Sequence, residues 1–442
     1  LWVLRFDGDD GEPKALLLVH SLHGTTIGAD ALHFSRDAPG GIEEKVREGF
    51  DHPVVVMLWQ AGTGDMAPNG APEPLSDDPI PSDYGDIEGA GAVARDLVAG
   101  LVPDIATTTE VDLAAVHAYA RIDRETLGYA EGEFPFEGGG AYCEKEGDQC
   151  WSEETGWTPI EGLDKACLDV KLFLGEGVPD KTFFSAIRIG DLAVVTYPGE
   201  PVTACTLEVE ENIHAEFPGQ AVVVVGYTQD YIGYSTPEED WYQGAYEASG
   251  AIWGPKQGDY VTARVSELGL HLLDPGAFPL PFEQPDPFPV EIPDASAWNV
   301  SASPVAGTVV TEPAAKLVPG AVAVFEFTGG DPWLLLPRMA LEKDMGDGAW
   351  EPVTWPSGEP VDGSGYEATW EVFPDPDYTS KPTATVRTYT WRLSLPTRRH
   401  QEPGFGDLDG TYRLRVTGSF RSQETMAVES YEVLSAAFTI SD

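Results

Sequence analysis

The chain has 442 residues, of which 74 are acidic and 26 basic, giving a formal net charge of -48. This charge excludes electrostatic binding to nucleic acid or to an anionic membrane surface, because both are themselves negative. Frequent glycine (48) and proline (37), with many aromatic residues, indicate a loop-rich, β-rich globular protein, and the length suggests two or three domains, of which we expect two.

The first part of the chain alternates predicted strands and helices. Apolar runs predict strands over 1–6, 14–20, 53–59 and 111–122, and helical spacing predicts helices over 41–50 and 86–101. The run at 14–20 is apolar through its middle, so we expect a central strand there, and the run at 53–59 is predicted to be buried as well. This alternation indicates an α/β domain with a mixed, layered sheet.

Polar loops follow two of these strands. His23 lies just beyond the strand at 14–20, where it could be a hydrogen-bonded loop residue or a metal ligand. The strand at 53–59 is followed by QAGTGDMAPNG, whose small residues could aim backbone N–H groups into an anion or oxyanion site. The spacing does not match a phosphate-binding GxxxxGK[ST] loop.

The cysteines bear on the compartment. Cys143 and Cys150 flank a polar hexapeptide that a disulfide could close, and Cys167 could compete as a partner. They lie in or near a polar, aromatic excursion, 128–161, that we expect to form a lid or rim loop. A metal site formed by cysteines typically requires closely spaced CxxC pairs, which the sequence lacks. We therefore favour a disulfide, and hence an extracellular or periplasmic protein.

The segment 186–201, AIRIGDLAVVTYPGEP, organises the candidate site. Residues 192–195 predict a strand buried on both faces, and Pro198 and Gly199 end it. Glu200 should then lie where the chain leaves the core. A carboxylate in such a place is costly unless a positive group meets it, although an exposed loop glutamate is the commoner case.

The rest of the chain completes one domain and forms a second. A helix over 202–214, the strand AVVVVGY and a helix over 258–272 are predicted, with an aromatic segment between the last two that we expect to be core or substrate wall. We place the first domain at 1–275, a proline-rich linker at 276–300 and an immunoglobulin-like β-sandwich at 301–442. The sandwich is expected to serve packing and recognition.

The motifs LLLVHSLHGT, QAGTGDMAPN, IRIGDLAVVTYPGEP, YTQDYIGYSTPEED and YEASGAIWGP, in this order, resemble the neutral ceramidase family. The likeness covers nearly the whole chain. Members of that family are zinc amidases that cleave ceramide into a fatty acid and sphingosine. The resemblance therefore implies a zinc-dependent hydrolase that acts on a linear amide or lipid-like substrate, with ceramide suspected and a zinc-activated water as nucleophile. Together with the export inferred from the cysteines, this predicts a secreted enzyme.

The resemblance also assigns residues. Carried over position by position, it implies zinc ligands at His23, Glu200 and Tyr231, and Tyr242 or Tyr246 could donate to the tetrahedral oxyanion.

The resemblance also makes Asp65 a candidate catalytic residue, and the loop that includes it is part of the implied active site. In the family that loop carries an active-site serine, and here Ala67 replaces it. An alanine excludes any mechanism that needs a hydroxyl at this position.

The remaining zinc histidine of the family belongs to an HTH-type motif that has no counterpart in this sequence. Either the motif lies on a companion N-terminal fragment, this chain being the larger product of a cleavage, or this branch has lost the site. We expect cleavage. The alternative function, from a different class, is a catalytically impaired or non-enzymatic extracellular binding or assembly protein on the same scaffold.

Overall fold

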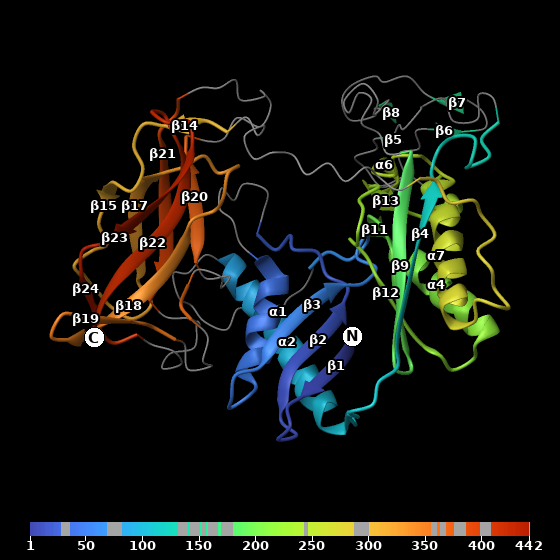
Figure 1. The fold of residues 1–442 in the computed structure, drawn as a ribbon, viewed down its shortest axis with the longest axis horizontal. Helices are drawn as coiled ribbons and strands as arrows, with labels where there is room; N and C mark the ends of the chain where they lie inside the picture. Colours follow the sequence, from blue (N-terminus) through green and yellow to red (C-terminus); the bar gives the residue numbers. More distant parts are fainter. Residues whose placement is uncertain are drawn as a thin grey trace.

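A computed structural model gives the fold of the chain (Figure 1). The described residues are 1–27, 36–68, 82–130, 140–141, 151–152, 156–157, 167–168, 180–242, 246–286, 300–354, 360–362, 368–374, 386–397 and 408–441. Within these ranges, no helix is both long enough and apolar enough to cross a membrane.

The first sheet has the strand order β1-β2-β3, with β1 antiparallel and β3 parallel to β2. Its strands are β1 (Trp2–Asp7), β2 (Pro13–His20) and β3 (Val55–Gln60). The helices that cover it are α1 (Asp37–Glu48) and α2 (Ser82–Leu101), and a 3-10 turn, η1 (Val102–Asp104), follows α2. Side chains alternate along β2, so Leu16 and Leu18 pack with Ile42 of α1 and Val98 of α2, whereas Val19 belongs to a separate cluster on the other face.

The second sheet has the order β12-β10-β9-β4, in which β10 and β12 are parallel and the other pairs antiparallel. Its elements and helices are β4 (Leu113–Arg121), β9 (Lys181–Ile189), β10 (Leu192–Thr196), α4 (Thr203–Glu216), β12 (Ala221–Val225) and α7 (Gln257–Leu273). Val195 packs with Val209 of α4 and Val265 of α7, whereas Val194 of the other face packs with Val19 of the first sheet.

The two sheets therefore lie face to face, with helices on both outer sides. Figure 1 shows α1 and α2 on one side of this α/β/β/α arrangement and α4 and α7 on the other. The arrangement explains the apolar runs: β10 is covered by helices on one face and by a sheet on the other, so both of its faces must be apolar. The predictions of a central strand at β2 and of a doubly buried strand at β10 are confirmed.

The prediction that the strand at 53–59 is buried is wrong for part of its length. In β3, Val56 is buried against the helices, but Val55 is 57% exposed and Met57 is 44% exposed. β3 is an edge strand of its sheet, and on the face that carries Val55 and Met57 the cluster shared with the second sheet reaches Trp59 at the end of the strand, whereas Val55 and Met57 stay exposed. An edge strand of this kind has the same apolar composition as a buried one, which is why the sequence did not distinguish them.

Short elements lie after β10 of the second sheet and within the excursion at 128–161. β11 (Glu200–Pro201) pairs parallel with β13 (Tyr234–Ser235), and α5 (Glu238–Trp241) and α6 (Tyr246–Ser249) lie beyond β13. In the excursion, β5 (Gly140–Ala141) pairs with β8 (Cys167–Leu168), and β6 (Trp151–Ser152) pairs with β7 (Gly156–Trp157). The predicted disulfide lies outside the described residues, because Cys143, Cys150 and the side chain of Cys167 are not among them. Cys205 is buried with a free thiol.

The C-terminal part consists of two β-sheets around one core (Figure 1). One sheet has the order β16-β24-β22-β18-β19, with β14 and β23 also paired to β22, and the other has the order β15-β17-β21-β20. The strands are β14 (Ala302–Ser303), β15 (Val309–Thr311), β16 (Lys316–Leu317), β17 (Val322–Gly329), β18 (Arg338–Gly346), β19 (Ala349–Pro352), β20 (Thr369–Phe373), β21 (Tyr389–Pro396), β22 (Gly410–Ser422), β23 (Val428–Leu434) and β24 (Phe438–Ile440). Phe325 and Trp391 of one sheet share the core with Leu414 of the other. The immunoglobulin-like topology and the domain boundaries stay predictions.

The first part of the predicted linker is attached to the α/β part of the chain. Leu280 and Phe282 pack against the core beneath α7, and Lys181 Nζ of β9 donates a hydrogen bond of 2.7 Å to the carbonyl of Asp286. Residues 287–299, which complete the predicted linker, lie outside the described residues.

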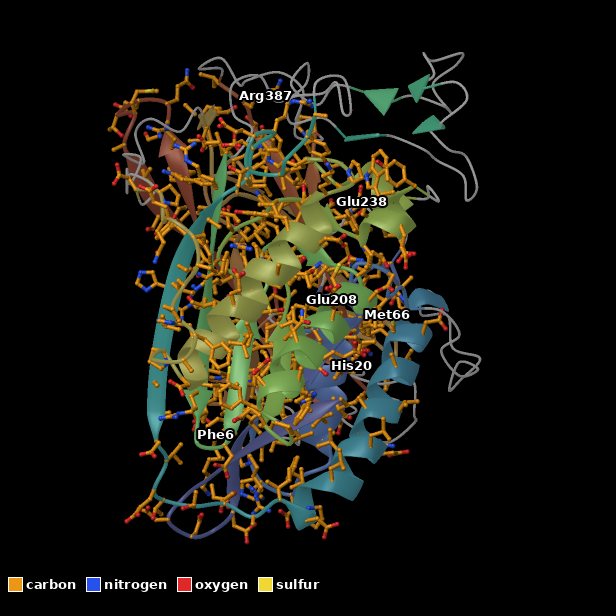
Figure 2. The ribbon with its side chains drawn as sticks, turned by 90° about the vertical axis from the view of Figure 1, so that its right-hand side faces the viewer. Phe6, His20, Met66, Glu208, Glu238 and Arg387 are labelled. Atoms are coloured by element: carbon orange, nitrogen blue, oxygen red, sulfur yellow. The ribbon has the colours of Figure 1, made fainter. Side chains whose placement is uncertain are left out.

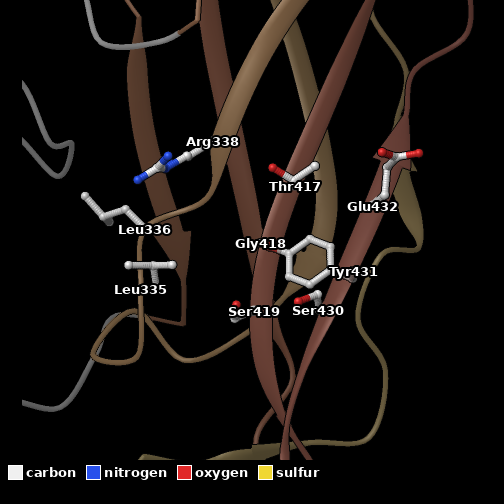
Figure 3. A pocket seen from close by; sticks show the side chains of 9 residues that line it. All are labelled: Leu335, Leu336, Arg338, Thr417, Gly418, Ser419, Ser430, Tyr431 and Glu432. Atoms are coloured by element: carbon white, nitrogen blue, oxygen red, sulfur yellow. The ribbon is translucent and has the colours of Figure 1, made fainter.

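A surface pocket of about 430 Å³ lies in the C-terminal part, on the face formed by β18, β22 and β23 (Figure 3). Leu335 and Leu336 form part of its lining, together with Arg338, Tyr431 and Glu432. These residues come from other elements than those that carry His23 and Glu200, so the pocket is distinct from the site predicted from the sequence.

Candidate functional site

Glu200 is placed by a tight turn at the end of β10. Gly199 has φ of +71°, and a Cβ atom there would lie 2.3 Å from the carbonyl oxygen of Gly233. Only glycine fits both the conformation and the space. The Glu200 N–H then donates to the same Gly233 carbonyl at 2.9 Å, which starts the β11–β13 pair. Glu200 is 7% exposed, so the expectation of a carboxylate at the edge of the core holds, and the solvated alternative does not.

His23 is held by the loop that follows β3. Its backbone N–H donates to the Met66 carbonyl at 2.9 Å, and the Gly64 N–H donates to the Pro201 carbonyl at 2.9 Å. One loop thus bonds both to the segment after β2 and to the segment after Glu200. Figure 2 shows side chains in this region, with His20 and Met66 labelled. The glycine-rich loop therefore ties the end of the first sheet to the end of the second.

A tyrosine-bearing loop follows β12. Tyr227 and Gln229 have φ of +54° and +66°, in the left-handed region that side-chain-bearing residues rarely adopt. The Tyr227 N–H donates to the Gly199 carbonyl at 2.8 Å, and Thr228 Oγ1 donates to the Tyr197 carbonyl at 3.0 Å. These bonds fold the loop back over the turn that carries Glu200, so its tyrosines face the carboxylate.

Four side chains meet at this point. His23 Nε2 lies 3.7 Å from Glu200 Oε2. The Tyr227 hydroxyl donates to Glu200 Oε2 at 2.6 Å and lies 3.1 Å from His23 Nδ1, and the Tyr231 hydroxyl donates to Glu200 Oε1. Each carboxylate oxygen therefore accepts a hydrogen bond from a phenol, and the imidazole lies beside one of the two oxygens. The structure brings together His23, Glu200 and Tyr231, the three residues that the family resemblance implies as metal ligands.

Burial and the adjacent carboxylate determine the state of Tyr227. Desolvation is the largest cause, followed by the hydrogen bond that the phenol donates to Glu200 and by the negative charge of Glu200, and together they raise the pKa of the Tyr227 phenol above its ordinary value. The phenol therefore keeps its proton across the neutral range and acts as a hydrogen-bond donor. Tyr227 is 39% exposed and Tyr231 is 54% exposed, so Tyr231 lies further toward the outside of the cluster.

The predicted catalytic residues outside this cluster have other surroundings. Asp65 Oδ1 accepts hydrogen bonds from the backbone N–H and the hydroxyl of Thr203, both at 2.8 Å, so this carboxylate holds the first turn of α4. The Tyr242 ring packs edge-on against Trp241, with ring centroids 5.3 Å apart. Tyr246 begins α6, and its side chain lies outside the described residues. Catalytic roles for these three residues stay predictions.

Tyr227 is the member of the cluster that sequence reasoning missed. It is the first tyrosine of the YTQDY segment and directly follows the strand AVVVV and Gly226. Its position after a buried strand was the available signal, the same signal that pointed to His23. The left-handed backbone that turns it toward Glu200 could not be inferred from the residue type.

The fold now described is similar to that of solved ceramidase structures. The chain is similar in structure to the neutral ceramidase from Pseudomonas aeruginosa, with a TM-score of 0.66, 17% sequence identity, and coverage of all of this chain and 71% of that one. It is equally similar to a ceramidase complexed with C2, with a TM-score of 0.65, 17% identity, and coverage of 99% and 71%. No protein-family model matches the sequence, and no curated protein matches it. At this identity the likeness confirms the resemblance at the level of the fold.

Proposed function

We propose that this chain is a zinc-dependent hydrolase that cleaves an amide bond in a lipid-like substrate, as the name of its structural neighbours implies for them. The observation that carries the proposal is the convergence of His23, Glu200 and Tyr231, which come from loops after three different strands. Such a convergence of an imidazole, a carboxylate and a phenol in one place is typical of a metal or catalytic centre.

The chemistry of these donors fits zinc. Zinc lies about 2.0–2.2 Å from nitrogen and oxygen ligands, so two donors on one ion are within about 4 Å of each other, and the 3.7 Å between His23 Nε2 and Glu200 Oε2 meets that condition. His23, Glu200 and Tyr231 would hold the ion. When bound, zinc would acidify a water molecule and polarise the carbonyl of the scissile amide.

The described residues supply one imidazole and one carboxylate at this point. Within the described ranges, no group of three or more His, Cys, Asp or Glu side chains is close enough to hold a metal ion. A zinc ion here would therefore depend on a phenol, and the histidine of a companion fragment would complete its ligands. This fragment, and an extracellular or periplasmic location, are parts of the proposal, as is an immunoglobulin-like recognition domain at the C-terminus.

The chain's own residues would orient the substrate. Glu200 holds the O–H groups of Tyr227 and Tyr231 toward itself. Tyr231 is more exposed than Tyr227, at 54% against 39%, so an incoming amide would meet the phenol of Tyr231 first. Tyr242 and Tyr246 remain candidates for donors to the oxyanion. Ala67 offers no hydroxyl, so no covalent step at that position belongs to the proposal.

The test is metal content and activity on the same preparations. We expect about one zinc per chain in the wild-type protein, with release of fatty acid from a short-chain N-acylsphingosine, and we expect Glu200→Gln to lose both. The matched control is Glu211→Gln, on the exposed side of α4, which should keep both. Mass spectrometry of everything that copurifies would detect a companion fragment. A folded wild-type protein that binds no zinc would instead support a non-enzymatic scaffold.

A further inference from the structure

Tyr227 lies between His23 and Glu200 and contacts both. Its hydroxyl is 2.6 Å from Glu200 Oε2 and 3.1 Å from His23 Nδ1. We propose that Tyr227 is a positioning residue whose hydroxyl fixes the neutral His23 imidazole in the tautomer that is protonated on Nδ1 and leaves the Nε2 lone pair open beside Glu200. The value of this tautomer for binding zinc rests on the proposed function, whereas the tautomer itself does not.

The argument follows the protons. A phenol has one O–H proton, and a carboxylate can only accept. The 2.6 Å contact assigns the Tyr227 proton to Glu200 Oε2. The Tyr227 oxygen then presents a lone pair to His23 Nδ1, so Nδ1 must carry the proton that completes the 3.1 Å contact. In a neutral imidazole the other nitrogen, Nε2, is then unprotonated.

The opposite tautomer fits this site less well. With its proton on Nε2, His23 could donate to the Gly64 carbonyl at 3.4 Å, which is longer than the usual N–H···O distance of about 2.7–3.2 Å. His23 Nδ1 would then compete with Glu200 for the single proton of Tyr227, and one of the two shorter contacts would be lost. An unmet polar contact at a buried carboxylate is costly.

The backbone supports a dedicated placement of this phenol. Tyr227 adopts a left-handed conformation, and its N–H donates to the carbonyl of Gly199, the residue before Glu200. Its orientation is therefore coupled directly to the turn that places the carboxylate. A residue held in an unfavourable conformation by its surroundings is characteristic of functional sites.

Histidine-ring NMR on metal-free protein tests the inference. Two-bond ¹H–¹⁵N spectra at about pH 8.5, where an ordinary imidazole is neutral, report which ring nitrogen carries the proton, and His23→Asn assigns the signals. We expect one tautomer for His23 in the wild-type protein, with Nδ1 protonated and Nε2 bare. Tyr227→Phe keeps the ring but removes the hydroxyl, so we expect a mixture of tautomers or the opposite one.

Tyr231→Phe is the matched control, because Tyr231 contacts the other oxygen of Glu200. It should leave the His23 tautomer unchanged. The inference would be overturned if His23 of the wild-type protein were protonated on Nε2. It would also be overturned if the Tyr227→Phe variant, shown to be folded by circular dichroism, gave the same His23 signals as the wild-type protein.

Zinc affinity separates this inference from the proposed function. A partner that fixes the tautomer of a zinc histidine typically contributes about 10–100-fold to affinity, so we expect Tyr227→Phe to bind zinc that much more weakly in a chelator competition. A wild-type protein with the expected tautomer but no zinc binding would refute the proposed function alone. If the wild-type protein binds zinc and Tyr227→Phe binds it with the same affinity, the positioning role alone would be refuted.

Discussion

At the scale of single residues, Gly199 determines where Glu200 lies. Alanine at this position would meet the Gly233 carbonyl oxygen at 2.3 Å and would also have to adopt φ of +71°. We expect Gly199→Ala to destabilise the protein by about 2–6 kcal/mol, since strain and overpacking each cost about 1–3 kcal/mol. Urea unfolding measures this change, and zinc content should fall with it because the carboxylate moves.

Gly219 provides the control for the conformational part of this effect. It has φ of +86°, but no atom lies within 4 Å of the position that a Cβ would occupy. Gly219→Ala should therefore cost only the backbone strain and leave zinc content unchanged. Equal destabilisation by the two substitutions would show that the contact with Gly233 is unimportant.

Two residues of the site could be singled out from the residue pattern, as polar residues that follow an apolar strand, whereas Tyr231 was implied by the resemblance alone. These two residues are His23 and Glu200, and the structure places them together. Asp65 lies in a comparable loop, but its carboxylate binds the start of α4. Tyr227 is bonded to both His23 and Glu200, yet no role was predicted for it. Partners of a loop side chain depend on loop conformation, which short-range sequence patterns do not specify.

At the scale of elements, α1 and α2 approach one another through glycines. A Cβ atom on Gly91 of α2 would lie 2.5 Å from the carbonyl oxygen of Gly41 in α1. We expect Gly91→Ala to push the helices apart and to destabilise the protein by about 1–3 kcal/mol. Thermal unfolding of the purified variant measures the effect.

Gly100 lies in the same helix and is the matched control. No atom lies within 4 Å of its Cβ position, so Gly100→Ala should stabilise the helix by up to about 1 kcal/mol, the difference in helix propensity. If both alanines raised the stability, the close contact between the helices would not be real.

The buried thiol of Cys205 in α4 predicts that the stability of the folded protein falls at alkaline pH. Burial raises the pKa of the Cys205 thiol to about 12, and it also raises the pKa of Tyr197, which packs beside it. The unfolded thiol loses its proton near pH 8.5, so between about pH 9 and 12 the folded state binds more protons than the unfolded state. The thiol's contribution to stability is thus fully present below pH 8.5 and lost as pH rises to 12.

Replacing the thiol tests this dependence. At about 1.4 kcal/mol for each pKa unit, the loss of stability from Cys205 is of the order of 5 kcal/mol. Cys205→Ser keeps a donor for the Ser235 carbonyl, which Cys205 Sγ contacts at 3.4 Å, but does not ionise. We expect its free energy of unfolding to fall less steeply above pH 9 than that of the wild-type protein. Parallel pH profiles would contradict the prediction.

Elements were predicted well because their patterns are local. The predicted helix at 258–272 is observed as Gln257–Leu273, and the predicted helix at 86–101 ends at Leu101 as expected. The pairing of two sheets face to face was not predicted, since apolar residues on both sides of β2 and β10 indicate burial but do not identify the partner layer. The exposed face of β3 was missed for the same reason.

At the scale of the whole molecule, the described hydrophobic cores of the α/β part and of the C-terminal sheets are separate. Phe184 is fully buried in the first and Phe325 in the second. We expect calorimetry to show two unfolding transitions, because each part has a core of its own. Phe184→Ala and Phe325→Ala should each lower the free energy of unfolding of one part by about 3–5 kcal/mol, so that one transition moves to a lower temperature and the other does not move. A single transition that both substitutions shift together would rule out independent domains.

The bonds between the glycine-rich loop and the ends of both sheets have a kinetic consequence. His23 belongs to the segment after β2, and Glu200 to the segment after β10, so a ligand gripped by both must be released before the layers can separate there. A ligand bound to both His23 and Glu200 should therefore slow amide hydrogen exchange in β2 and β10 together, because both strands become exposed in one opening event. Neither strand gains a new hydrogen bond.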